Sequence, residues 1–181
     1  MRDSRLIFIM GKRGSGKSLT ATLFALFYKI KGFKVYSNMQ RLKLADGHIK
    51  DYNKHFWDDN DNSPKVLIID EAQKDLDSRR AMSDDNIGYT NIIAQSRKNN
   101  LDIIITSTRY HNIDVRVRDI VDYYILPHFN KKNNILTLYY YDDSQELTKI
   151  KNYHIPNWLF NLYDTTEKIL PDTFERDNNE K

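Results

Sequence analysis

A glycine-rich octet near the amino terminus constrains the fold more than any other stretch of the chain. It is Gly11-Lys12-Arg13-Gly14-Ser15-Gly16-Lys17-Ser18, and it matches the pattern G-x-x-x-x-G-K-[S/T] at every fixed position. This pattern forms a phosphate-binding loop when a buried strand precedes it and a helix follows it. Residues 6–10 are all apolar, and apolar residues recur at helical spacing from Leu19 to Ile30. Both conditions are met, so the octet predicts a P-loop at a strand-to-helix turn.

The residue types of the octet suit a nucleoside triphosphate. Glycine at three positions permits backbone conformations in which several N–H groups converge on an anion. The helix that follows directs its positive end at the same point. We expect Lys17 to reach the β- and γ-phosphates and the Ser18 hydroxyl to bind Mg²⁺. Residues 11–19, which include Leu19, are therefore assigned to ATP binding.

Composition sets limits on the rest of the chain. The chain has 181 residues, of which 40% are hydrophobic and 29% charged, as in an ordinary globular protein with one core. We expect one domain over residues 1–171 and a polar tail over residues 172–181. The lack of cysteine excludes disulfides, the five histidines lack zinc-ligand spacing, and no apolar run reaches the ~18 residues of a membrane span. A net charge of +3 is too small to establish a nucleic-acid partner.

A second motif follows the apolar residues 66–69. Three of these four residues are β-branched, which predicts a buried strand, and the adjacent carboxylates of Asp70 and Glu71 stand at its carboxyl end. Open α/β sheets bind ligands at that edge. Asp70 suits Mg²⁺ binding through water, and Glu71 suits the polarisation of a water molecule that attacks the γ-phosphate. The second carboxylate favours hydrolysis over phosphoryl transfer to a hydroxyl, which is the reaction of a small-molecule kinase.

The remaining pattern predicts an α/β fold with a mainly parallel sheet flanked by helices. A polar, irregular excursion is expected from Arg41 to Ser63, and a β-hairpin is expected to close the sheet edge. The other expected elements are strands at residues 33–38, 101–106, 120–126 and 135–141, helices around 52–57, 89–96 and 158–163, and a hairpin turn at 130–134. We therefore expect a P-loop NTPase fold of RecA/ASCE-like type with a C-terminal β-hairpin.

Hydroxyl groups occupy the end of the expected strand at 101–106. Thr106, Ser107 and Thr108 follow one another there. A polar residue at this tip is placed to sense the γ-phosphate, and we assign Thr106 to the nucleotide site on this basis. A serine- and threonine-rich turn is an equally good interpretation.

Several stretches together resemble the FtsK/HerA-type ATPases. They are the glycine loop, IIDEAQ at 68–73, a helix ending in Ser-Arg-Lys at 96–98, LDIIIT at 101–106, I-D-x-x-x-R at 113–118, D-Y-Y at 122–124 and L-Y-D-T-T-E at 162–167. The resemblance is greatest to a short viral branch, the genome-packaging ATPases of archaeal and internal-membrane viruses, and to the related Zot-like phage ATPases. It extends over residues 6–126 and includes the Y-D-T-x-E ending.

This resemblance implies a ring-forming motor that pushes double-stranded DNA and is fuelled by ATP and Mg²⁺. The expected protein is a viral genome-packaging ATPase that forms a pentameric or hexameric ring. It would act in the host cytoplasm or on the virion, next to a capsid or membrane protein at the portal vertex. Two alternatives remain: a Zot-like, nucleotide-switched assembly or secretion ATPase, and a nucleoside or nucleotide kinase.

Such a motor is expected to need an arginine from a neighbouring subunit at each ATP site. Arg97 is the first candidate, because it ends the expected helix just before the strand at 101–106; alternatively, it caps its own helix. The rival candidates are Arg79, Arg80, Arg109 and Arg118. The pairs Arg79-Arg80 and Lys131-Lys132 are candidates for DNA phosphate contacts, with ordinary solvated loop charge as the alternative.

Overall fold

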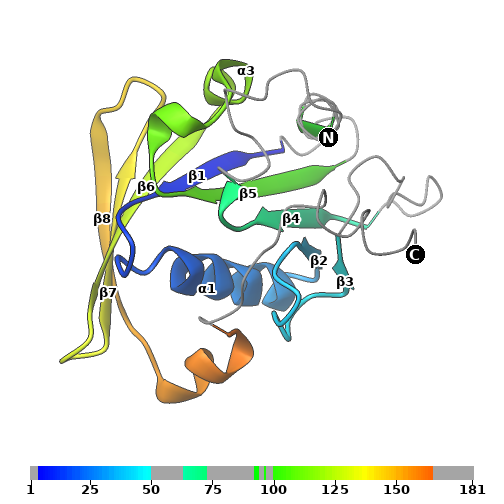
Figure 1. Cartoon of the computed structure of the whole chain (residues 1–181). Helices are drawn as coiled ribbons and strands as arrows, with labels where there is room; N and C mark the ends of the chain where they lie inside the picture. Colours follow the sequence, from blue (N-terminus) through cyan, green and yellow to red (C-terminus); the bar gives the residue numbers. More distant parts are fainter. Residues whose placement is uncertain (1–3, 50–62, 73–91, 94–95, 97–99, 165–181) are drawn as a thin grey trace, which may run out of the picture.

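The computed structural model describes residues 4–49, 63–72, 92–93, 96 and 100–164. Figure 1 shows the arrangement of the elements. The elements are β1 (Leu6–Met10), α1 (Lys17–Ile30), β2 (Lys34–Ser37), β3 (Gly47–His48), β4 (Lys65–Ile69), β5 (Leu101–Ser107), η3 (Tyr110–Asn112), α3 (Val115–Arg118), β6 (Tyr123–Asn130), β7 (Ile135–Tyr141), β8 (Leu147–His154) and η4 (Asn157–Leu162), where η denotes a 3-10 helix. In this part of the chain no helix combines the length and apolar character needed to cross a membrane.

The described strands form one sheet in the order β3-β2-β4-β5-β1-β6-β7-β8. Neighbouring strands from β3 to β6 are parallel, whereas β7 is antiparallel to β6 and β8 is antiparallel to β7. The strand before the glycine loop, β1, therefore lies in the middle of the sheet, and the carboxyl ends of the parallel strands share one edge. This mainly parallel sheet with a C-terminal hairpin confirms the predicted P-loop NTPase fold.

Both faces of the central strands are buried. On one face, Ile9, Ile68 and Ile104 pack with the apolar side of α1. On the other face, Phe8, Leu67 and Ile103 join a second cluster that includes residues near α3. Side chains alternate between faces along a strand, so a continuous apolar run is what a doubly covered parallel strand requires.

The carboxyl-terminal part of the sheet differs from the prediction. The hairpin of β6 and β7 does not close the edge, because β8 pairs with β7 along its length and is the edge strand of the described sheet. Most of β8 is exposed and polar, so its sequence lacks the apolar alternation that marks a half-buried strand. The strand predicted at 120–126 corresponds to β6, which starts three residues later, at Tyr123, and ends four residues later, at Asn130.

Two other expectations are only partly covered by the structure. The excursion from Arg41 contains the short strand β3, which pairs with β2 and was not expected; the helix expected around 52–57 lies outside the described residues. Of the helix expected at 89–96, the structure describes residues 92, 93 and 96. The helix α1 ends at Ile30, and Gly32 has a φ of 81°, so the predicted lysine and glycine stop signal is confirmed.

The chain after β8 returns beneath α1 and docks on the segment after β2. The 3-10 helix η4, orange in Figure 1, lies against α1. The backbone N–H of Lys43 donates to the carbonyl of Leu162 over 2.9 Å, and Arg41 forms an ion pair with Asp164. Leu159 is fully buried in the cluster beneath α1 and anchors this return segment.

Replacing Leu159 by alanine is expected to lower the free energy of unfolding by about 2–5 kcal/mol, the usual cost of a large-to-small core substitution. Denaturant unfolding followed by circular dichroism measures the change. The matched control is Trp158→Ala, because the neighbouring side chain is 53% exposed and should change stability by no more than about 0.5 kcal/mol. Equal effects of the two substitutions would show that η4 is not docked as described.

Candidate active site

The glycine loop joins β1 to α1 at the carboxyl edge of the sheet. The N–H of Gly11 donates to the carbonyl of Ser107 at the end of β5 over 3.3 Å. Gly16 precedes the first helical residue with φ 100° and ψ 22°, a left-handed conformation that strongly favours glycine. The Thr20 hydroxyl donates to the Gly16 carbonyl over 2.8 Å. The loop is therefore tied to the sheet at one end and to α1 at the other.

Gly16 also permits close contact between the loop and the β6–β7 hairpin. A Cβ atom at this position would lie 3.1 Å from both Phe129 Cβ and Leu136 Cδ1. Those distances are shorter than ordinary carbon contacts of about 3.5–4.0 Å, so the hairpin would have to shift to admit a side chain. The glycine that the motif pattern requires here thus serves both backbone conformation and packing.

Lys17 lies at the amino end of α1 and is 9% exposed. Its Nζ donates to the carbonyls of Gly11 and Lys12, over 2.9 and 3.2 Å, so the ammonium group lies across the loop. Burial lowers the pKa of Lys17 below its usual value, and the carboxylates of Asp70 and Glu71 act in the opposite direction. A partly desolvated cation held against the backbone of this loop is a suitable partner for phosphate.

Ser15 provides a further indication that the loop fits an anion. Its Oγ is buried, and it has no hydrogen-bond partner among the described residues. Buried hydroxyl groups nearly always have a partner in native proteins, so an isolated one calls for a ligand or solvent. Lys12 and Arg13 are exposed beside it and add positive charge to the same loop.

Asp70 lies directly after β4 and receives hydrogen bonds from two other elements. The Ser18 hydroxyl of α1 donates to Asp70 Oδ2 over 2.9 Å, and the Thr106 hydroxyl of β5 donates to Asp70 Oδ1. Burial raises the pKa of the Asp70 carboxyl, although these two hydrogen bonds oppose the increase. The hydroxyl and the carboxylate that were predicted to bind Mg²⁺ are therefore in direct contact.

This pair fits a magnesium ion that arrives with a nucleotide. Mg²⁺ in nucleotide sites takes one or two protein ligands and completes its shell with phosphate and water. Accordingly, the described residues need no larger cluster of acidic or histidine side chains, and none with three such groups is found among them. Ser18 Oγ and the Asp70 carboxylate are the side-chain oxygens that fit this role.

Asn38 is a site residue that the sequence analysis missed. It follows β2 and is 6% exposed. Its side-chain amide donates to the Asp70 carbonyl over 2.9 Å and accepts from the Asp70 N–H over 2.8 Å. These two bonds hold the backbone of Asp70 as a neighbouring strand would. A polar residue at the end of β2, where the parallel strand beside β4 ends, is the signal that could have identified it.

Glu71 has an unusual backbone conformation for a residue with a side chain. Its φ is 53°, and its N–H donates to the Thr106 hydroxyl over 3.1 Å. Left-handed backbone at non-glycine residues costs free energy and is concentrated at functional sites. Thr106 thus bonds to both members of the acidic pair. It is fully buried, and its predicted role in sensing the γ-phosphate stays a prediction.

The return segment brings Tyr163 towards the same edge. Burial and the negative charge of Asp70 together raise the pKa of the Tyr163 hydroxyl to about 12. Tyr163 and Asp164 belong to the L-Y-D-T-T-E ending noted in the sequence. Tyr163 is buried in the cluster that includes Leu42, and Asp164 forms the ion pair with Arg41, so both residues fix the return segment against the segment after β2. The rest of that ending, from Thr165, lies outside the described residues.

The other residues predicted to belong to the site lie in different environments. Leu19 is 3% exposed and packs in the core beneath α1, so its assignment to ATP binding stays a prediction. Arg109 is exposed and lies two residues after the end of β5, near the carboxyl edge. The Arg118 guanidinium lies over the Tyr110 ring of the same chain, 4.7 Å from its centroid. Arg79, Arg80 and Arg97 lie outside the described residues.

Replacing Gly16 by alanine is expected to lower ATP affinity about tenfold or more, because left-handed backbone and the approach of Phe129 each oppose a Cβ atom. Titration with a fluorescent ATP analogue measures the change. The control is Gly32→Ala, which has φ 81° but no atom within 4 Å of the added Cβ, and it lies at the opposite end of α1. Wild-type affinity in Gly16→Ala would show that ATP does not require this loop conformation.

Replacing Asn38 by leucine is expected to leave the buried N–H and carbonyl of Asp70 without partners and to lower stability by about 1–3 kcal/mol. Displacement of Asp70 should also remove most of the gain in ATP affinity that Mg²⁺ provides. Chemical unfolding and ATP titrations with and without Mg²⁺ measure both effects. Asn152→Leu makes the same change at an exposed position of β8, where the amide oxygen accepts from the Thr137 hydroxyl at the surface, and should have little effect on stability and none on the Mg²⁺ dependence. Unchanged Mg²⁺ dependence in Asn38→Leu would contradict the role of Asn38.

Three structural similarities agree with this geometry. The N-terminal domain of zonular occludens toxin from Neisseria meningitidis has a TM-score of 0.63 at 20% identity, and the match covers 90% of this chain and 100% of that chain. The genome packaging NTPase B204 from Sulfolobus turreted icosahedral virus 2, in complex with AMPPCP, has a TM-score of 0.61 at 16% identity, with 86% and 99% covered. B204, the DNA-packaging ATPase from Sulfolobus turreted icosahedral virus, has a TM-score of 0.55 at 17% identity, with 86% and 99% covered.

Two comparisons by sequence give different results. A search of curated proteins gives no match, whereas a search of family models does. The family model described as Zonular occludens toxin (Zot) matches residues 42–168, a segment that begins after the glycine loop and includes the acidic pair, β5 and the C-terminal hairpin. The matched segment is more than half of the chain. The chain therefore belongs to the zonular occludens toxin (Zot) family and has a P-loop NTPase fold.

Proposed function

We propose that this chain is an ATP-hydrolysing motor subunit that translocates double-stranded DNA and packages a viral genome. The observation that carries the ATPase part is the contact between the Ser18 hydroxyl and the Asp70 carboxylate, 2.9 Å apart beside the glycine loop. The two groups come from motifs far apart in the sequence, and they meet at the edge where a sheet of this kind binds its ligand. The likeness to B204, whose name describes a genome packaging NTPase, supports the same assignment.

Each residue of the site has a defined role in this proposal. The loop amides and Lys17 bind the β- and γ-phosphates, and Ser18 and Asp70 hold Mg²⁺. When bound, Mg²⁺ neutralises charge on the phosphate oxygens. Glu71 accepts a hydrogen bond from the attacking water and orients it towards the γ-phosphate. Thr106 and Asn38 position the acidic pair without touching the reacting atoms.

The motor part of the proposal requires a ring of copies of the chain. In the transition state, charge on the γ-phosphate oxygens exceeds what Lys17 and Mg²⁺ offset, and an arginine from a neighbour typically contributes ~10³- to 10⁵-fold in rate. Arg97 remains our first candidate. Arg109, exposed after β5, is the best-placed rival among the described arginines, since Arg118 stacks on Tyr110 of its own chain. The ring would act at a portal vertex beside a capsid or membrane protein.

A second function has its own support. Membership of the Zot family favours a nucleotide-switched assembly or secretion ATPase, which binds ATP and a protein partner without moving DNA. Both functions use the same ATP site, so the site geometry does not separate them. The response of ATP hydrolysis to DNA does separate them, because only the motor couples hydrolysis to DNA contact.

The test is ATP hydrolysis by the full chain with and without double-stranded DNA. Hydrolysis is expected to require Mg²⁺ and to increase on addition of DNA. Lys17→Ala should abolish ATP binding, whereas Glu71→Gln should bind ATP and lose turnover by roughly 10²- to 10⁴-fold, because Glu71 acts only on the attacking water. Glu146→Gln makes the same change in an exposed turn and is the control.

The outcomes separate the parts of the proposal. Full turnover by Glu71→Gln would remove this glutamate from the mechanism. Hydrolysis by the wild-type chain that is indifferent to DNA would favour the assembly or secretion ATPase. Phosphoryl transfer to a nucleoside in preference to water would favour a kinase.

A further inference from the structure

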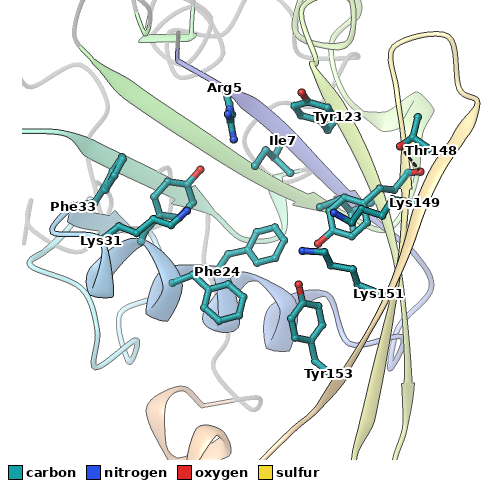
Figure 2. A pocket seen from close by; sticks show the side chains of 14 residues that line it. Arg5, Ile7, Phe24, Lys31, Phe33, Tyr123, Thr148, Lys149, Lys151 and Tyr153 are labelled. Carbon is teal, nitrogen blue, oxygen red and sulfur yellow. Dashed lines mark hydrogen bonds between the residues drawn. The ribbon is translucent and has the colours of Figure 1, made fainter. Parts of the chain in front are cut away.

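A groove opens on the α1 face of the sheet, at the end opposite the ATP site (Figure 2). Its volume is about 600 Å³, within the range of small-molecule sites. Ile7 of β1 and Ile125 of β6 form part of its floor, aromatic side chains of α1 form one wall, and β8 forms the other. We call it the α1–β8 groove. The helix α1 begins at the ATP site and reaches this groove with its last turns.

The charged side chains that line the α1–β8 groove all have the same sign. Four cations line it: Arg5, Lys31, Lys149 and Lys151, and all four are exposed. Figure 2 shows them on different sides of the space. No carboxylate is among the described residues that line the groove.

The carboxylates close to the start of β1 already have hydrogen-bond donors. Asp102 is 1% exposed and accepts from the Arg5 N–H over 3.1 Å and from the Tyr28 hydroxyl over 2.6 Å. Asp122 accepts from the Leu6 N–H over 2.7 Å. Both carboxylates are therefore held by donors of β1, of the residue before it and of α1, and neither of them lines the groove.

Aromatic rings supply the remaining surface of the groove. Tyr123 is 42% exposed at the start of β6 and presents a ring beside Arg5. Phe27 and Tyr153 pack together with ring centroids 5.9 Å apart. Tyr140 also lines the groove; burial and a hydrogen bond to Tyr153 raise the pKa of its hydroxyl. Lys149 is the partner of Tyr140 in the β7–β8 register, so charge and aromatic surface alternate over short distances.

We infer that the α1–β8 groove binds an unpaired nucleotide of single-stranded nucleic acid, with the base against Tyr123 and the phosphates on Lys149 and Lys151. Grooves that combine cations with exposed aromatic rings bind single strands in this way, because every base has a face that stacks and every linkage has a charge. This inference rests on the proposed DNA motor and adds a second binding surface to it, for a strand with unpaired bases.

A duplex would use the groove differently. Its bases are stacked inside the helix, so only its phosphates would reach the rim of the groove. A single strand makes the same phosphate contacts and adds base stacking. The groove should therefore favour a single strand over a duplex of equal length, and the preference should depend on the bases.

The test uses fluorescence anisotropy of the full chain with three labelled probes of equal length: a thymidine oligonucleotide, its duplex with adenine, and an abasic phosphodiester chain. The wild type should bind the thymidine strand most tightly. Tyr123→Ala should weaken that binding by roughly 5- to 150-fold and leave binding of the abasic chain unchanged. The double variant Lys149→Gln, Lys151→Gln should weaken both, and the salt slope for the thymidine strand should fall by about 0.7 for each lysine–phosphate pair that the substitutions remove.

The control variant is Lys34→Gln, Lys43→Gln, which removes the same charge from two exposed positions in and after β2, neither of which lines the groove. It should leave binding of the thymidine strand unchanged, and all the variants should retain basal ATP hydrolysis. If the two double variants weaken binding of the thymidine strand equally, the effect is one of net charge and the proposal is overturned. Tighter binding of the duplex than of the thymidine strand would also overturn it. So would equal binding of the abasic chain and the thymidine strand. Unchanged binding with new self-association in Lys149→Gln, Lys151→Gln would also overturn it, by showing that these lysines only protect an edge strand. Each of these results leaves the ATPase assay interpretable, because basal hydrolysis is measured without DNA.

Discussion

The site depends on a carboxylate buried at the end of a parallel strand. A buried charge without hydrogen bonds costs several kcal/mol, so the surrounding elements must supply donors. Asp70 receives them from α1 through Ser18 and from β5 through Thr106, while Asn38 at the end of β2 bonds to its backbone. Helix α1 and strands β2, β4 and β5 are thereby held in one arrangement. The same interactions also fix the position of the glycine loop, because α1 begins where the loop ends.

The parts of the site that the sequence predicts are those in which residue type and spacing are tightly restricted. The loop from Gly11 to Ser18 admits few alternatives, and the acidic pair follows a strand too apolar to lie anywhere but the core. Asn38 was not predicted, because an amide that bonds to a backbone N–H and carbonyl can occur after any strand. Its role depends on which strand lies beside it, and the order of strands in a sheet is a tertiary property.

The same limit applies to the fold. The central strands β1, β4 and β5 were predicted because burial on both faces leaves a continuous apolar run. The edge strand β8 was not, because one ladder of hydrogen bonds to β7 needs no apolar residues, and seven of its eight residues are exposed. The match to the Zot family adds independent support, because it starts at residue 42 and so excludes the glycine loop. The glycine loop, identified by its residue pattern, and residues 42–168, identified by the family match, therefore indicate the same fold.

The central position of β1 has a consequence for synthesis on the ribosome. Arg5, just before this strand, bonds to Asp102 across 97 residues, and Leu6 bonds to Asp122 across 116 residues. Strand β1 is therefore left without its neighbours β5 and β6 until those later strands have emerged. Such separated pairings make folding slow and leave an apolar segment exposed in the nascent chain. The strand that leads into the nucleotide-binding loop is thus the one most in need of protection before the domain closes around it.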